Sequence, residues 1–147
     1  RLSSSSYKRP ESVLVVVYTT GGDLLMLQRR DPPDFWQSVT GSLEPGEPAV
    51  DAARRELQEE TGLQLTVTDC HCTNRFSIHP AWRARYAPDV SENTEHVVRV
   101  ALPAPCEVTL NPDEHRAYRW VPAQQAAQLA SSSTNREAIR AFAARPG

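Results

Sequence analysis

Three glutamates in the middle of the chain have the residue type and the spacing for metal chemistry. Glu59 and Glu60 follow Glu56 by three and four positions, and side chains at those separations lie on one face of an α-helix. Placing them together is unfavourable, because like charges at this spacing repel by about 0.2–0.5 kcal/mol per pair. Carboxylate oxygens are the ligands that hard cations such as Mg²⁺ prefer. The pattern alone leaves two interpretations open, a metal-binding helix face or a solvated acidic surface.

The residues around these acids predict one helix that follows a loop. Pro48 suits the first position of a helix, because its missing N–H is not needed there. Alanines and long side chains favour about fourteen helical residues, and Gly62 can end the helix with a left-handed cap. Residues 41–47 form the preceding loop, with a turn at Pro45-Gly46. An apolar stripe on another face of the helix is expected to pack on the core: Val50, Ala53 and Leu57.

Taken whole, the stretch from Gly41 to Leu63 resembles the signature of the Nudix hydrolases. It matches every defined position of that pattern, Gly41-x5-Glu47-x7-Arg55-Glu56-Leu57-x-Glu59-Glu60-x-Gly62-Leu63. The resemblance implies an α/β fold, namely an α/β/α sandwich with a mixed β-sheet and a catalytic loop–helix–loop. It also implies hydrolysis of nucleoside diphosphates linked to another moiety, with Mg²⁺ or Mn²⁺ as the cofactor.

The resemblance also gives roles to the acids. Glu56 and Glu60 are expected to be the main metal ligands, and they share a face because positions i and i+4 point nearly the same way. Glu59 either binds the metal or acts as the base for the attacking water, so all three acids form the catalytic set. One more metal-binding acid is expected from the loop before a late strand, where Glu114 matches best and Asp113 competes.

Four residues of the signature are expected to support the site. An ion pair between Glu47 and Arg55 would fix the loop to the helix, because charged hydrogen bonds are strong. Gly41 would permit either a close backbone approach or an unusual dihedral angle. Gly62 would end the helix that carries the acids.

Segments outside the signature resemble a bacterial branch of the same family that acts in folate synthesis. These segments are Tyr7–Pro10, Leu25–Asp31, Asp34–Ser42, Arg85–Pro88 and Glu114–Trp120. The resemblance implies release of pyrophosphate from 7,8-dihydroneopterin triphosphate, which leaves the monophosphate. It places the substrate contacts at Lys8, Arg29, Thr40, Phe76, Ser77, Ile78, His79 and Ser132.

The chemistry of such a substrate adds further candidates. A triphosphate needs cationic partners, and Arg9 and Arg30 stand next to Lys8 and Arg29 at the ends of the first two predicted strands. A flat bicyclic ring needs aromatic walls with a few polar groups. The candidates for those walls are Trp36, Phe76, Trp82 and Tyr86.

Three alternative functions use some of the same features. A general cleansing enzyme for dATP-like or oxidised nucleoside triphosphates would keep the metal and the acids and differ in its base pocket. A non-catalytic binding module is disfavoured, because a binder gains little from mutually repelling acids. A zinc site at Cys70-His71-Cys72 with His79 is also disfavoured, since strand alternation puts the two cysteines on one face and His71 on the other. Core or partly exposed thiols are expected instead.

The composition fits one domain over residues 7–147, after a polar tail over residues 1–6 that we expect to be disordered. A net charge of −2 gives no basic field for a nucleic acid polymer. No apolar run approaches the roughly 18 residues of a membrane span, and the tail lacks the apolar segment of a secretory signal. Three cysteines, an odd number, favour a cytoplasmic location. Nothing in the sequence indicates an obligate protein partner.

The remaining patterns predict a layered domain, with strands before and after the central helix and further helices at the end. Apolar or alternating runs predict strands or short extended pieces at residues 12–18, 23–30, 63–73, 76–79, 95–102, 107–110 and 117–121. Residues 74–94 are expected to form a long functional loop around the short strand. Helices are expected at residues 123–130 and 135–144, the second with Thr134 as its cap.

Overall fold

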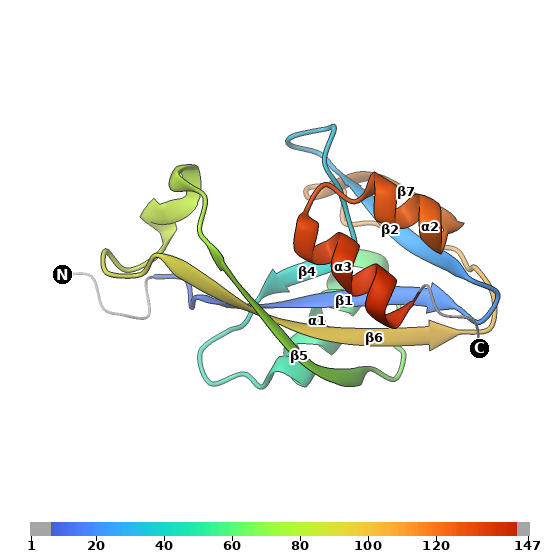
Figure 1. Cartoon of the computed structure of the whole chain (residues 1–147), viewed down its shortest axis with the longest axis horizontal. Helices are drawn as coiled ribbons and strands as arrows, with labels where there is room; N and C mark the ends of the chain where they lie inside the picture. The colour runs from blue at the N-terminus through green and yellow to red at the C-terminus, as the bar shows by residue number, and fades with distance from the viewer. Residues whose placement is uncertain (1–6, 144–147) are drawn as a thin grey trace.

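The computed structural model describes residues 7–143, and its centre is a mixed β-sheet with helices on both faces (Figure 1). α1 (Ala49–Thr61) packs on one face, and α2 (Ala123–Leu129) and α3 (Ser133–Phe142) pack on the other. This arrangement confirms the predicted α/β/α sandwich. The strands are β1 (Glu11–Thr19), β2 (Asp23–Arg29), β3 (Trp36–Gln37), β4 (Val39–Ser42), β5 (Thr68–Ser77), β6 (Glu92–Leu102) and β7 (His115–Pro122).

β1 and β2 diverge from each other, and the two shortest strands fill the opening between them. β1 pairs with β2 at Tyr18 and Leu24, next to their connecting turn. The first half of β1 pairs with β4, and the second half of β2 pairs with β3. On the outer sides, β6 runs parallel to β1, β5 runs antiparallel to β6, and β7 runs antiparallel to β2. Because β4 lies in this opening and leads directly into the loop before α1, that loop starts from the middle of the sheet.

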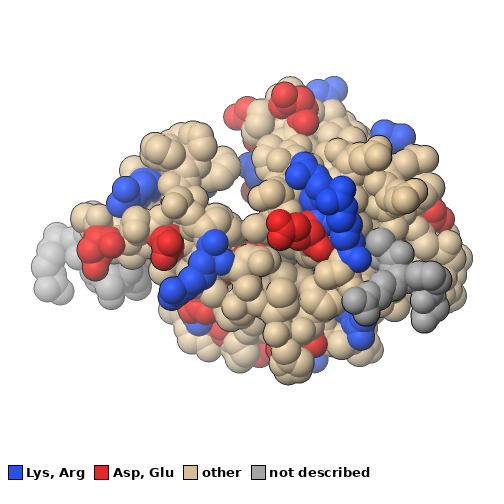
Figure 2. Space-filling view, in the orientation of Figure 1, with Lys and Arg blue, Asp and Glu red and all other residues tan. Residues whose placement is uncertain are grey.

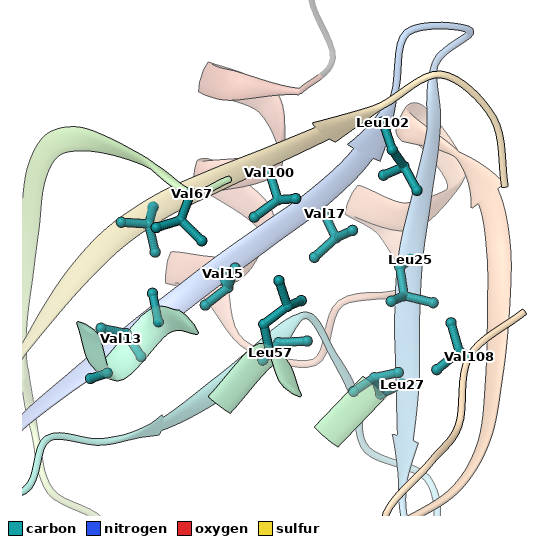
Figure 3. Close-up of a cluster of buried hydrophobic side chains, with 14 of the residues drawn as sticks. Val13, Val15, Val17, Leu25, Leu27, Leu57, Val67, Val100, Leu102 and Val108 are labelled. Atoms are coloured by element: carbon teal, nitrogen blue, oxygen red, sulfur yellow. The ribbon is translucent and has the colours of Figure 1, made fainter. Parts of the chain in front are cut away.

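β1 is apolar at successive positions because the sheet is covered on both faces. Val13, Val15 and Val17 belong to the core under α1, whereas Leu14 and Val16 belong to the core under α2 and α3. Figure 3 shows part of the core under α1. The helix closes this core with Ala52, Ala53 and Leu57, each 0% exposed. The stripe predicted from the sequence therefore faces inward, and the signature acids lie on other sides of the helix.

Local signals set both ends of α1. Pro48 has φ −67° and ψ 150°, so it is the extended residue just before the helix and not the first helical residue as predicted. Gly62 ends the helix in the left-handed conformation at φ 75°, as predicted, and its N–H donates to the carbonyl of Gln58. Pro48 and Gly62 therefore fix the first and last residues of the helix that carries the signature acids.

Residues 74–94 form an arm that extends away from the sheet (Figure 1). The sequence predicted a long loop around a short strand at residues 76–79. Phe76 and Ser77 are indeed in a strand, but they are the end of β5, and β6 already begins at Glu92. Between them lies the 3₁₀-helix η2 (Pro80–Arg85). The N–H of Lys8 donates to the carbonyl of Arg85 at 2.8 Å, so the start of the described chain is tied to the arm.

Other boundaries differ from the prediction for identifiable reasons. Residues 63–67 were predicted as part of a strand, but β5 begins at Thr68. Leu63, Leu65 and Val67 produce the alternating apolar pattern because they pack on the core under α1, although their segment is not in a strand. Residues 107–110 are not in a strand either, and the N–H of Val108 donates to the hydroxyl of Tyr118.

The last helix also starts differently from the prediction. Its cap is Ser132 and not Thr134, because the Ser132 hydroxyl accepts from the N–H of Asn135. The predicted disordered tail over residues 1–6 and the predicted last helical residue, Ala144, lie outside the described residues. None of the helices within residues 7–143 has both the length and the hydropathy of a membrane span.

Candidate active site

A cleft of about 570 Å³ lies between the arm and the rest of the molecule. Figure 2 shows a hollow between the arm and the main body. The arm contributes Phe76, Ser77, Ile78, His79, Trp82, Arg85, Tyr86 and Asn93. The rest of the lining comes from Lys8, Ser12, Arg29, Gln37, Thr40, Gly41, Ser42, Glu56 and Glu114. Of the described side chains, the exposed large hydrophobic ones are Phe76 and Trp82, and both line this cleft.

Glu56 is the signature acid that faces the cleft from α1. A Cβ atom on Gly41 would lie 2.1 Å from its Cδ atom, so the glycine is required for close approach. Burial raises the pKa of the Glu56 carboxyl to about 7, Arg55 opposes this shift, and the charges of Glu59 and Glu60 add to it. The carboxylate is therefore held in a place that favours a neighbouring cation.

The other two signature acids lie near Glu56 and differ from each other in exposure. The charges of both raise the pKa of Glu56, and Arg55 Nη1 lies 3.1 Å from Glu56 Oε2 and 3.4 Å from Glu59 Oε2. Glu60 is buried, with Oε2 lying 3.0 Å from Nδ1 of His115 and Oε1 accepting from the Asn111 side chain. Glu59 is on the solvent side, with 53% of its side chain exposed. Side chains at successive helical positions differ in direction by about 100° around the helix axis, which separates Glu59 from Glu60. The residues that surround Glu60 come from a distant loop, so the helix pattern alone does not predict them.

The loop before β7 carries both candidates for the additional acid expected from the sequence. Glu114 lines the cleft, whereas the competing Asp113 is not among its lining residues. Within residues 7–143, no group of three or more His, Cys, Asp or Glu side chains is already gathered in the way that holds a metal ion.

Arg55 connects the loop to the helix. Its guanidinium donates through Nε and Nη2 to the Glu47 carboxylate, at 2.9 Å each, and through Nη2 to the carbonyl of Ser42. Nη1 donates to Glu56 at 3.1 Å. The ion pair predicted from the signature is thus present, and its hydrogen bonds lower the pKa of the Glu47 carboxyl and raise that of Arg55.

The predicted substrate residues fall into two groups. Lys8, Arg29, Thr40 and residues 76–79 all line the cleft. Ser132 is not among the lining residues. Its hydroxyl caps α3 and bonds to Thr134. Among the wall candidates, Trp36 also lies outside the lining, and its ring packs with Arg119.

Two predicted cations have structural partners. Arg9 pairs with Glu11 and donates to the carbonyls of Glu44 and Glu47, so it fixes the loop before α1. Arg30 donates to the carbonyl of Pro112. Neither arginine is among the residues that line the cleft.

Several polar residues of the cleft were not among the predicted site residues. Arg85 belongs to a segment that resembles the family, and that segment was the signal that could have identified it. Gln37 links the cleft to the buried ring of His115, with Nε2 of each 3.2 Å apart. Asn93 donates to the hydroxyl of Ser12. Gln37 also belongs to a resembling segment, Asp34–Ser42. No sequence signal marks its contact with His115 or the contact of Asn93 with Ser12, because each joins elements far apart in the chain.

The two neighbouring cysteines of β5 are not part of any group of three or more metal-binding side chains within residues 7–143. Cys70 and Cys72 are partly buried and pack against the core under α2 and α3, as expected for partly exposed thiols. His71 lies between them at φ 54°, where the register of β5 and β6 shifts. His79 lies at the cleft and caps η2 by accepting from the N–H of Ala81.

The fold, the signature loop–helix and the acid-lined cleft together define a known class of domain. Residues 8–142 match the NUDIX domain family, and the chain belongs to this family. Nudix hydrolases generally need divalent metal ions.

Three comparisons place the chain more narrowly within the family. It is 50% identical over 142 residues to the dihydroneopterin triphosphate diphosphatase of Escherichia coli K12, across 92% of this chain and 93% of that protein. It is 39% identical to the Haemophilus influenzae protein of the same name, across 92% and 89% of the two chains. The structure of the E. coli dihydroneopterin triphosphate pyrophosphohydrolase superimposes with a TM-score of 0.85 at 50% identity, across 93% of this chain and 97% of that one.

Proposed function

We propose that this chain hydrolyses 7,8-dihydroneopterin triphosphate to the monophosphate and pyrophosphate, a step of folate synthesis. The observation that supports this substrate is the two-sided cleft. Its arm presents the exposed rings of Phe76 and Trp82, and its body presents the cations Lys8 and Arg29 next to acids. A flat ring joined to a triphosphate needs both kinds of surface. The relatives at 50% and 39% identity are named for the same activity.

The acids at the cleft fit a divalent cation in kind and in charge. Glu56 is a partly buried carboxylate whose pKa is raised by that partial burial, and a bound cation would relieve the unfavourable charge. Glu56, Glu60 and Glu114 would hold Mg²⁺ or Mn²⁺, with Glu59 as a further ligand or as the base. When bound, the cation neutralises charge on the phosphate oxygens and helps to activate the attacking water.

The protein side chains would position the substrate and remove a proton. Hydrolysis requires a water molecule in line with one phosphorus atom and neutralised phosphate oxygens. Lys8 and Arg29 would bind those oxygens, Arg29 with the planar fork of its guanidinium. The Thr40 hydroxyl donates to the carbonyl of Val13 at 2.8 Å, so its oxygen is held in place at the cleft. Glu59, on the solvent side of α1, would accept a proton from water if it is the base.

The substrate is a small molecule, and the proposed function requires neither a nucleic acid polymer nor an obligate protein partner. We expect the reaction to take place in the cytoplasm, the location that the cysteine usage predicts.

The test is pyrophosphate release with Mg²⁺ from dihydroneopterin triphosphate, dATP and GTP at equal concentrations. The expected result is a clear preference for the pterin compound and a loss of turnover by orders of magnitude in Glu56→Gln. Comparable rates on all three substrates would instead identify a nucleotide-cleansing enzyme. No release from any of them, with binding retained, would identify a binding module.

A further inference from the structure

Arg85 is a cation of the cleft that the proposed function has not yet used. It is the last residue of η2, it is exposed, and it lines the cleft from the arm. Among the described residues, its side chain has neither a hydrogen bond nor an ion pair with an acid. An unpaired guanidinium in a cleft is free to bind an anion.

Lys8 lies next to Arg85, and the two charges act on each other. The backbone N–H of Lys8 donates to the Arg85 carbonyl at 2.8 Å, and the Lys8 ammonium lies 5.8 Å from the ring centre of Tyr86. Burial lowers the pKa of Lys8, Arg85 lowers it further, and Glu56 and Glu114 oppose both effects. The two cations therefore repel each other, and an anion bound by both would relieve that repulsion.

The charge of the whole cleft depends on Arg85. Lys8 and Arg29 balance Glu56 and Glu114 in formal charge, so Arg85 leaves the lining with a net positive charge. A polyphosphate is the ligand that such a surface attracts, because it carries several negative charges along one chain. A neutral pterin ring would gain little from the same guanidinium.

Resting on the proposed function, we propose that Arg85 binds the phosphate chain of the substrate from the arm, opposite Arg29 and beside Lys8. The fork of the guanidinium can contact two phosphate oxygens at once. Arg85 then acts in substrate affinity and not in the chemical step, since it comes from the arm and not from the helix that carries the acids.

The test measures binding of tripolyphosphate and of neopterin by calorimetry, without metal and at fixed ionic strength, to the wild type and three variants. Arg85→Ala removes the fork, and Arg85→Lys keeps the charge without it. Arg75→Ala is the matched control, because Arg75 is an exposed arginine of the arm that does not line the cleft. Thermal unfolding checks that all variants are folded.

The expected result is a loss of tripolyphosphate affinity of about tenfold in Arg85→Ala, with a smaller loss in Arg85→Lys. Neopterin affinity should be unchanged in both variants, and Arg75→Ala should match the wild type. In turnover assays, Arg85→Ala should raise KM by a similar factor with little change in kcat. Unchanged tripolyphosphate affinity in Arg85→Ala, or an equal loss in Arg75→Ala, would overturn the inference.

The two proposals fail in different ways. If the wild type does not hydrolyse dihydroneopterin triphosphate but Arg85→Ala still loses tripolyphosphate affinity, the substrate proposal fails and the role of Arg85 is supported. If the wild type hydrolyses the pterin compound and Arg85→Ala has unchanged KM and affinity, the role of Arg85 is rejected and the substrate proposal is retained.

Discussion

At the scale of single residues, the Glu56 carboxyl group lies directly against the backbone of Gly41. The carboxyl group occupies the space that a Cβ atom on residue 41 would need. This explains why a signature that is rich in acids also requires a glycine fifteen residues earlier in the chain. The glycine allows the backbone of β4 to lie directly against the proposed metal ligand.

Gly41→Ala should therefore inactivate the enzyme with little effect on folding. The added methyl group would displace the end of a flexible glutamate side chain and leave the core of the protein unchanged. We expect kcat to fall toward that of Glu56→Gln, while the melting temperature falls by only a few degrees. Gly21→Ala is the control, because its Cβ would meet its nearest neighbour at an ordinary 3.8 Å. Wild-type turnover in Gly41→Ala would show that Glu56 is not needed in its present position.

At the scale of elements, the loop before α1 is held to the helix by charge. Arg55 binds Glu47 through two hydrogen bonds, and the side chain of Glu47 is only 15% exposed. Glu44 also approaches Arg55, at 3.4 Å, but 63% of its side chain is exposed. A shielded bidentate pair is worth more than an exposed contact.

Glu47→Gln should lower the free energy of unfolding at pH 7 by about 1–2 kcal/mol, whereas Glu44→Gln should lower it by less than about 0.5 kcal/mol. The stabilisation has a defined pH dependence. Arg55 holds the pKa of Glu47 below its ordinary value of 4.5, so the contribution is complete above that value and is lost as pH falls through the lowered pKa. Urea unfolding at pH 7, 5 and 3.5 checks this. If the difference in free energy of unfolding between the wild type and Glu47→Gln stays constant down to pH 3.5, the proposed pH dependence is contradicted.

The elements also show which features the sequence could predict. The alternation of core residues in β1 and the glycine cap of α1 follow from local rules, because each depends on neighbouring residues in the chain. β4 was not predicted, since it has four residues and exists because it pairs with β1. The inward position of Glu60 was missed for a similar reason, because His115 and Asn111 reach it from a distant loop.

At the scale of the whole molecule, the splayed sheet and the arm produce one cleft with two different sides. The acids belong to α1 and to the loop before β7, which lie on the main body. The exposed rings belong to the arm, which is an extension of β5 and β6. Such exposed rings mark a binding surface. Recognition of the ring and recognition of the phosphates should therefore be separable by mutation.

Trp82→Ala should weaken ring binding and leave phosphate binding intact. The side chain is 45% exposed and its ring lies 5.5 Å from that of His79, so its removal costs little packing. Stacking of a flat ring on an aromatic side chain is worth about 1–3 kcal/mol, so neopterin affinity should fall about tenfold. KM for the pterin triphosphate should rise by a similar factor, with tripolyphosphate affinity unchanged. This is the opposite pattern to that of Arg85→Ala, and equal losses of both ligands in Trp82→Ala would show that the arm acts as a single unit.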